Sequence, residues 1–254
     1  KNIDNKVVSD FGKEWQAFNH QDIDKSFLDS AFDSYFHFFP FDDVSNAEGF
    51  DMGCGSGRWA KFVAPKVGFL NCIDPSEVAL EQAKLNLINV KNCSFECNGV
   101  DGNSLKDKSQ DFGYSLGVLH HIPDTPLALK ACAKKLKSGA PFLLYLYYRF
   151  DDKPVWFRMI WKLTDFFRVI ISRMPFTLKK TICYIIAIVV YYPLSRLSKY
   201  LEKAGFDVSN VPLSAYKHQP FYTLATDALD RFGTKLEQRF TKPEIIKMML
   251  DANF

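Results

Sequence analysis

One loop constrains this chain more than any other feature, because it carries glycine at every second position: Gly53, Gly55 and Gly57. The residues Phe50-Asp51-Met52 before it are typical of the end of a strand, and a helix is expected to begin near Arg58. Glycine accepts positive φ and has no Cβ to hold a ligand away. The loop N–H groups and the helix N-terminus could then approach a bound molecule closely. The segment therefore predicts a strand–loop–helix turn that holds a cofactor.

The spacing of the glycines separates two kinds of cofactor. A dinucleotide fold usually shows G-x-G-x-x-G, with an acidic residue about 20 residues further on that holds the ribose. This chain reads G-x-G-x-G, with Asp51 two positions before the first glycine. An acidic residue does follow at a suitable distance, since Asp74 ends the apolar run 69–73.

The pattern D-x-G-x-G-x-G resembles the first motif of class I S-adenosylmethionine (SAM)-dependent methyltransferases. Three further matches follow in order: Asp74, then Asp101 after the short strand 93–97, then the segment 111–124, which resembles the fourth strand of that family and its loop. The resemblance covers residues 45–148 and is nearest to the ubiquinone/menaquinone-biosynthesis type (methyltransferase type 11), whose members act on many small molecules.

The resemblance implies SAM as cofactor, with S-adenosylhomocysteine as product. It implies that Asp74 takes the ribose hydroxyls and that Asp101 faces the adenine amino group. Two structural alternatives stay open: Asp74 could cap the helix 76–87, and Asp101 could be a turn residue. The implied cofactor residues are Asp51, Gly53, Cys54, Gly55, Gly57, Asp74, Pro75, Val100, Asp101, Gly102, Leu116 and Gly117.

Strand and helix patterns alternate up to residue 148, which favours an α/β fold with a parallel sheet covered on both faces. We expect strands at 48–53, 69–74, 93–97, 112–118 and 141–148, and helices at 57–65, 76–88 and 125–137. The predicted fold class is a Rossmann-like, doubly wound, mostly parallel sheet with an α-helical insertion. Ahead of it, residues 1–44 are expected to form a helical cap, with Phe11, Trp15 and Phe18 on one helical face and His20 beyond them. The resemblance implies that this segment closes over the cofactor; plain packing is the alternative.

The alternation stops at residue 149, and residues 149–239 are predicted to be a helical insertion. Residues 154–172 fit an amphipathic helix with a wide apolar face. A second helix is expected at about 178–203, kinked at Pro193. The uncharged run 182–192 would reach only about 16 Å against a hydrocarbon core of about 30 Å, so we expect it not to span a membrane. The polar stripe of the first helix is Arg158, Lys162, Asp165, Arg168 and Ser172.

The charge of the chain is concentrated in this insertion. Residues 153–203 contain ten Lys/Arg and two Asp/Glu, which gives +8, so the rest of this +3 chain carries −5. We favour a lid over the active site; a homodimer interface and peripheral contact with an anionic membrane through 153–203 are the alternatives. Nucleic acid is disfavoured, because the basic residues alternate with bulky aliphatic ones.

His120 and His121 follow the predicted fourth strand, at the edge where the methyl group would point. A histidine is suited to act as a base near neutral pH. His121 matches the more recurrent histidine of the resembling family, although packing is an equal alternative for both. We expect methyl transfer to an oxygen or nitrogen, less readily a carbon, of a small molecule that is acidic or amphipathic. Candidate substrate residues are Tyr147, Tyr148, Arg149, Tyr216, His218, Tyr222 and Arg231.

Residues 240–254 are expected to return to the core as a helix. Thr241 and Glu244 have the spacing of a capping box, and Asn253 stands where a left-handed residue often ends a helix. In the resembling fold a sixth strand and an antiparallel seventh follow, and the sequence ends where they would begin.

The six cysteines are scattered, which favours a reducing, cytoplasmic setting and no metal site. Two other functions stay open: a non-catalytic or membrane-surface module on the same fold, and an NAD-dependent oxidoreductase.

Overall fold

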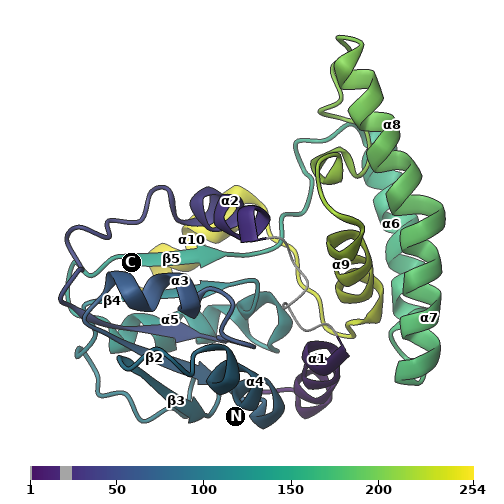
Figure 1. The fold of residues 1–254 in the computed structure, drawn as a ribbon. Coiled ribbons are helices and arrows are strands. Elements are labelled where there is room, and N and C mark those ends of the chain that lie inside the picture. Colours follow the sequence, from purple (N-terminus) through teal and green to yellow (C-terminus); the bar gives the residue numbers. More distant parts are fainter. Residues whose placement is uncertain (1, 18–24) are drawn as a thin grey trace. The chain divides into compact units, whose positions relative to one another are not determined.

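The computed structural model describes residues 2–17 and 25–254 and divides the chain into two compact units (Figure 1). Unit 1 comprises the residues up to Tyr148 together with Gln238–Phe254. Unit 2 is Arg149–Glu237.

Unit 1 is built on a five-stranded sheet in the order β3-β2-β1-β4-β5, in which every neighbouring pair is parallel. After β3 the chain returns to the other side of β1, so the carboxyl ends of β1 and β4 flank the point where the strand order reverses. Ligands of open α/β sheets bind at such a point. The predicted α/β fold is confirmed, although the fifth strand is shorter than the predicted 141–148. The strands are β1 (Glu48–Met52), β2 (Phe69–Asp74), β3 (Cys93–Cys97), β4 (Phe112–Leu116) and β5 (Phe142–Tyr145).

Helices cover both faces of the sheet because its strands are apolar on both sides. Leu70 and Tyr114 point into one core, with α2 (Lys25–Phe36), α3 (Ala60–Val63) and α4 (Glu77–Asn86). Phe50 and Ile73 point into the other, with α5 (Thr125–Lys135) and α10 (Lys242–Asp251). All four of these strand side chains are almost completely buried.

The helix after the glycine loop is much shorter than the predicted 57–65. It consists of α3 and one 3₁₀ turn, Ala64–Lys66. Gly57 still has a positive φ of 76°, which delays the start of the helix. Pro65 has no N–H to donate, which prevents continuation as an α-helix.

The capping residues predicted for the C-terminal helix are confirmed. Thr241 and Glu244 form the predicted capping box at the start of α10. Asn253 has the left-handed φ of 69° expected after the last turn. This helix packs on α5, within unit 1.

At the N-terminus, α1 (Asn5–Ala17) packs against α4. Of the aromatic residues predicted for one face of this segment, Phe11 is described in full. Phe18 and His20 lie outside the described residues, as does the side chain of Trp15.

Unit 2 is helical, as predicted. It contains one helix, α9, that the sequence pattern did not predict. It comprises α6 (Val155–Ile171), α7 (Phe176–Ile186), the π-helical segment Ala187–Tyr191, α8 (Tyr192–Lys203) and α9 (Phe221–Gly233). Both α6 and α7 pack against α9.

The second predicted helix of unit 2 is continuous from Phe176 to Lys203, which is 28 residues. The π-helical segment directly precedes Tyr192 and Pro193, and the N–H of Tyr192 donates to the carbonyl of Ala187, five residues back. By length and composition this helix is able to cross a membrane. The uncharged run 182–192 alone therefore underestimated the apolar length of this helix, and the expectation that it does not span a membrane stays a prediction.

Candidate functional site

The glycine loop after β1 has the backbone that its sequence predicts. Gly53, Gly55 and Gly57 have φ of 82°, 54° and 76°. A Cβ on Gly53 would lie 2.4 Å from Cγ1 of Val118, which follows β4. The loop is therefore packed against the end of β4, and only glycine fits at its first turn.

The N–H groups of this loop are used inside the chain. Those of Gly53 and Cys54 donate to the carbonyl oxygen of Ile73, at 2.7 and 3.1 Å. Gly55 donates to Oδ2 of Asp74 at 2.9 Å, and Gly57 to the carbonyl of Cys54. These donors are not turned outward as the sequence suggested, and a four-residue helix follows them. These four N–H groups are therefore not available to a pyrophosphate, which is bound at a helix N-terminus by free N–H donors.

Asp74, at the end of β2, joins the glycine loop to the start of α4. Its Oδ1 accepts from the N–H of Ser76 at 2.8 Å, while the hydroxyl of Ser76 caps the helix. Burial raises the pKa of Asp74 to about 6, and the two N–H donors oppose that rise. A carboxylate offers about four lone-pair sites, so two remain for ligand hydroxyls.

Asp51 lies inside the sheet beside Tyr114. Burial away from water raises its pKa to about 8, and the neighbouring Tyr114 hydroxyl offsets part of that rise. Within the described chain, its Oδ2 has no hydrogen bond of ordinary geometry. Asp51 therefore supports the loop from the interior and carries an energetic cost when ionised.

Asp101, after β3, is tied to the N-terminal segment. Its Oδ2 accepts from the backbone N–H of Asn2 at 3.1 Å. The Asn2 side chain also exchanges two hydrogen bonds with the backbone of Asp124, at 2.6 and 2.8 Å. Asn2 thus links the loop after β3 to the start of α5, and Asp101 itself stays exposed.

The two histidines after β4 differ in their surroundings. His120 is completely buried, and neither ring nitrogen has a hydrogen-bond partner within the described residues. Desolvation lowers the pKa of His120 well below its usual range, and His121 and Arg239 lower it further, so its ring is neutral at pH 7. The ring of His121 lies 5.0 Å from that of Phe11 on α1. Tyr147 packs on His120, with ring centroids 3.9 Å apart.

A returning segment closes this edge of the sheet. Gln238 donates its N–H to the carbonyl of His120 at 3.0 Å and its side-chain amide to the carbonyl of Ile122 at 2.6 Å. The guanidinium of Arg239 lies 5.0 Å from the Tyr147 ring centroid and donates to the carbonyl of Tyr148. The loops after β4 and β5 are therefore bound together by residues about a hundred positions further along the chain.

Comparison with known proteins identifies this part of the chain. Residues 50–144, from β1 into β5, match the family model described as a methyltransferase domain. Residues 50–144 are a methyltransferase domain. The sequence is also 33% identical over 99 residues to a ubiquinone biosynthesis O-methyltransferase of Neisseria meningitidis, and 31% identical over 93 residues to one of Idiomarina loihiensis.

These alignments cover 37% and 35% of this chain, and 42% and 37% of the relatives, so the chain spans less than half of their length. Among solved structures, the chain is similar to a SAM-dependent methyltransferase of Mesorhizobium loti, with 22% identity, a TM-score of 0.43, and 48% and 56% of the two chains covered. It is also similar to a phosphoethanolamine N-methyltransferase of Haemonchus contortus, with 15% identity, a TM-score of 0.44, and 53% and 31% covered.

The methyltransferase domain brings together the predicted cofactor residues from three strand ends. Gly53, Asp74 and Gly117 follow β1, β2 and β4, and a Cβ on Gly117 would meet no atom within 4 Å. The open space beside Gly117 and the remaining acceptor sites of Asp74 each fit a nucleoside such as that of SAM. Pro75 follows β2, Leu116 ends β4, and Val100, Asp101 and Gly102 follow β3.

The predicted substrate residues fall in both units. Tyr147 and Tyr148 belong to unit 1 and follow β5. The others belong to unit 2: Arg149, Tyr216, His218, Tyr222 and Arg231. The ring of Tyr216 lies 5.6 Å from that of Tyr191, and Nε2 of His218 lies 3.5 Å from Oε2 of Glu202.

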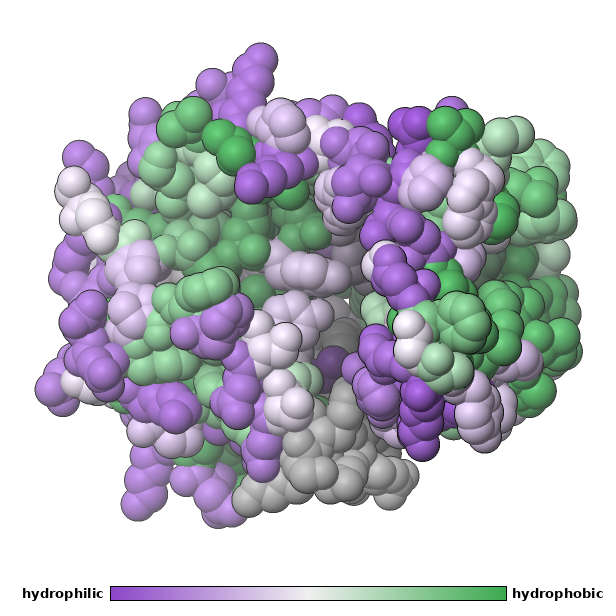
Figure 2. Space-filling view, turned by 90° about the horizontal axis from the view of Figure 1, so that it is seen from above, coloured by the Kyte–Doolittle hydropathy of each residue, from purple (hydrophilic) through white to green (hydrophobic). Residues whose placement is uncertain are grey.

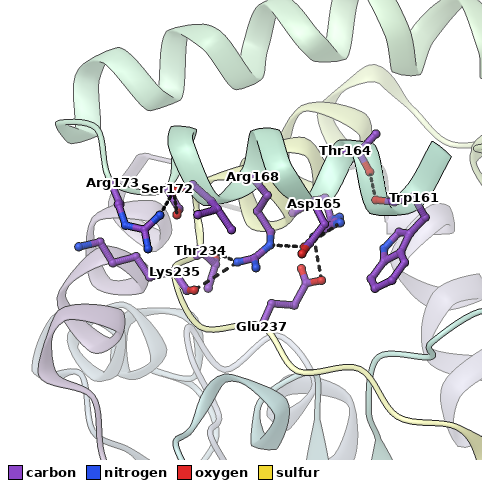
Figure 3. Close-up of polar contacts among 11 residues, drawn as sticks. Trp161, Thr164, Asp165, Arg168, Ser172, Arg173, Thr234, Lys235 and Glu237 are labelled. Atoms are coloured by element: carbon purple, nitrogen blue, oxygen red, sulfur yellow. Dashed lines mark hydrogen bonds and ion pairs between the residues drawn. The ribbon is translucent and has the colours of Figure 1, made fainter. Parts of the chain in front are cut away.

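Arg231 is part of a buried polar network. Its guanidinium pairs with Glu237 at 2.9 Å and with Asp165 at 3.3 Å. Figure 3 shows Asp165 and Arg168 pointing from α6 toward the segment of Thr234 and Glu237. Arg168 pairs with Asp165 at 2.7 Å and donates to the carbonyl of Thr234 at 3.1 Å. The charge of Arg231 is thus matched inside unit 2.

Three residues of the site region carried no signal in the sequence. Asn2, Gln238 and Arg239 have no motif around them, and their partners are distant in the chain. Only the fold brings them to the strand ends.

Proposed function

We propose that this chain is a SAM-dependent methyltransferase that transfers a methyl group to an oxygen or nitrogen of a small molecule. The methyltransferase domain at residues 50–144 and the O-methyltransferase relatives support this activity. Because those relatives act in ubiquinone biosynthesis by name, an oxygen acceptor on an amphipathic molecule is our first candidate.

The observation that carries the proposal is the pairing of the glycine loop with Asp74. Four N–H groups of the loop already donate inside the chain, while the carboxylate beside it retains acceptor sites for hydroxyl groups. A nucleoside without phosphates suits this combination. A dinucleotide does not, so NAD is the weaker candidate.

When bound, SAM supplies an activated methyl group on a sulfonium. The chain's own residues would position the methyl donor and the acceptor and would exclude water. Asp74 would bind the ribose hydroxyls and Asp101 the adenine edge. Positioning of donor and acceptor can contribute about 7–11 kcal/mol to lowering a barrier.

We propose His121 as the base for an acceptor that carries a proton, and His120 as a packing residue. His120 is neutral, buried and covered by Tyr147. A positioned base contributes roughly 10²–10⁴-fold. The cap formed by α1 places Phe11 against His121 and would help to exclude water there.

Calorimetry with SAM, S-adenosylhomocysteine and NAD tests the cofactor. SAM and its product should bind, and NAD should not. Asp74→Ala should weaken SAM binding by about 10–100-fold, since hydrogen bonds to a charged group contribute about 1.5–3 kcal/mol. Asp111→Ala is the matched control, because that carboxylate lies at the start of β4 and pairs with Lys137. Binding of NAD without SAM would refute the proposal.

Transfer of labelled methyl from SAM to a panel of phenols, carboxylates and amines tests the acceptor class. With an acceptor in hand, His121→Ala should lower kcat while SAM binding is kept. An equal loss in His120→Phe would show that the two histidines do not differ as proposed.

Three further expectations remain predictions: a cytoplasmic location, a homodimer, and a lid function for unit 2. Cell fractionation and light scattering test the first two. Crosslinking of unit 2 to a photoreactive SAM analogue tests the third.

A further inference from the structure

The helix α6 exposes its apolar side, whereas an amphipathic helix of a protein in water usually buries that side. Of its predicted polar stripe, Arg168 and Ser172 are buried and Asp165 is partly buried, whereas Arg158 and Lys162 are exposed. Its apolar side is exposed: Met159 is 66% exposed, Leu163 59% and Phe166 62%. A polar side faces the interior of unit 2 and an apolar side faces outward.

The long helix Phe176–Lys203 shows the same inversion. Lys179 is buried and donates from Nζ to the carbonyl of Gly233 at 3.0 Å. Ser195 and Ser198 are fully buried. On the outer side, Val189 is 64% exposed.

Together these exposed side chains form an outer apolar surface on unit 2. Figure 2 shows hydrophobic side chains gathered along its α6–α8 side, at the right of the view. Single exposed apolar residues are ordinary, but a contiguous group of this kind marks an interaction site. The outer apolar surface consists of Val155, Trp156, Met159, Ile160, Leu163, Phe166, Phe167, Ile170, Leu178, Tyr184, Ile185, Ile188, Val189, Val190, Tyr192, Leu197 and Tyr200.

Within residues 153–203, which carry this surface, the charges are almost all positive. Of the two acids in residues 153–203, Asp165 is paired with Arg168, and Glu202 with Lys217. Exposed basic side chains on the same helices and their connection include Arg158, Lys162, Arg173 and Lys203. An apolar surface with a basic border is complementary to anionic lipid headgroups above an acyl region.

We propose that unit 2 binds the surface of an anionic lipid bilayer through its outer apolar surface. The helices lie in the plane of the membrane, with the apolar side chains in the boundary between headgroups and acyl chains. Each basic residue near the surface adds roughly 1 kcal/mol. This attachment is independent of the chemistry proposed for the methyltransferase domain.

Lying in the plane is favoured over crossing, although Phe176–Lys203 is long enough to cross. To cross, this helix would have to leave α9 and break the hydrogen bond of Lys179 to Gly233. It would then expose Lys179, Ser195 and Ser198 to hydrocarbon, which is costly for a charged side chain.

Vesicle co-sedimentation of the full chain tests the proposal. We expect binding to phosphatidylcholine vesicles that contain phosphatidylglycerol, weaker binding without it, and weaker binding at high salt. The double variant Leu163→Glu/Phe166→Glu should lower the bound fraction at least about tenfold, because two large side chains lose their burial in lipid. Leu85→Glu is the matched control, since Leu85 is equally exposed on α4 of unit 1 and should leave binding unchanged.

The charge contribution is tested separately. Arg158→Glu/Lys162→Glu should weaken binding only to the anionic vesicles, whereas Lys84→Glu on α4 should have no effect. Circular dichroism confirms that each variant is folded.

Three outcomes would overturn the proposal. One is the absence of binding to both kinds of vesicle. Another is a concentration-dependent dimer that the Leu163/Phe166 variant dissociates without any vesicle binding, which would make a second copy the occupant. The third is resistance to alkaline carbonate extraction after expression in cells, which would indicate a helix that crosses the membrane.

Discussion

The two units of this chain are built with opposite polarity. In unit 1, Phe50, Leu70 and Tyr114 are completely buried in the sheet, between helices that turn their polar sides outward. In unit 2, the buried groups include Arg168 and Lys179, while large apolar side chains stand outward. Unit 1 is stabilised mainly by removing apolar surface from water. Unit 2 buries apolar residues too, such as Leu224 and Leu229 of α9, but it adds buried ion pairs and hydrogen bonds from charged side chains to backbone carbonyls.

This difference has a physical consequence. A buried apolar core tolerates the loss of a small apolar group. A buried ion pair that loses one partner leaves the other charge without compensation. Unit 2 should therefore be fragile to single changes in its polar network, and unit 1 should be sensitive to pH where it buries a carboxyl group, as at Asp51.

The largest effect is expected for Arg231→Met. It would remove the ion pair with the Glu237 carboxylate, whose side chain is 1% exposed. Breaking a buried ion pair in this way typically lowers the unfolding free energy by about 3–5 kcal/mol. Hydrogen exchange measured by mass spectrometry should show loss of protection in residues 149–237. Arg158→Met, at an exposed position of α6, is the control.

Strands β1 and β2 should keep their protection in Arg231→Met. If they lost it together with unit 2, the two units would unfold as one and the contrast between them would fail.

The next effect concerns Asp51 in unit 1. Its pKa rises from 3.8 in the unfolded chain to about 8 in the fold, so the folded protein keeps a proton that the unfolded chain releases. Between these values the unfolding free energy should therefore fall as pH rises, by about 1.4 kcal/mol per pH unit from this group. Asp51→Asn should remove that slope, and urea unfolding at pH 5 and pH 8 measures it.

Asp111→Asn serves as the opposite case. Its hydrogen bond with Lys137 lowers the pKa of Asp111, so its contribution is complete above pH 4 and is lost only on acidification. The slope between pH 5 and 8 should be unchanged in that variant. An unchanged slope in Asp51→Asn as well would mean that Asp51 is ionised in the fold.

The smallest effect tests where the last helix belongs. Thr241→Ala removes the capping box of α10 and should cost about 1 kcal/mol of stability. Because α10 packs on α5, hydrogen exchange should change in unit 1. Thr177→Ala, on an exposed turn of α7, is the control. A loss of protection confined to 149–237 would assign α10 to unit 2 instead.

Much of unit 1 could be predicted because its signals are local. The alternation of apolar runs and glycines marked all five strands, and Thr241 with Glu244 marked a helix start. The end of β5 and the length of α3 were missed, since a strand ends where its neighbour stops pairing and Pro65 follows the loop too soon for a long helix. Asn2, Gln238 and Arg239 were missed because their partners are set by the fold alone.

By itself, the sequence determined the glycine loop, the acidic residues after β2 and β3 and the parallel sheet beneath them, because each depends on short-range backbone and patterning rules. It also determined that α6 and the helix from Phe176 to Lys203 are amphipathic. Only the tertiary structure decided which side of those helices faces inward. That choice depends on the distant carbonyls of Thr234 and Gly233, which Arg168 and Lys179 find, and on the pairing of Arg231 with Asp165 of α6, and no periodicity records it.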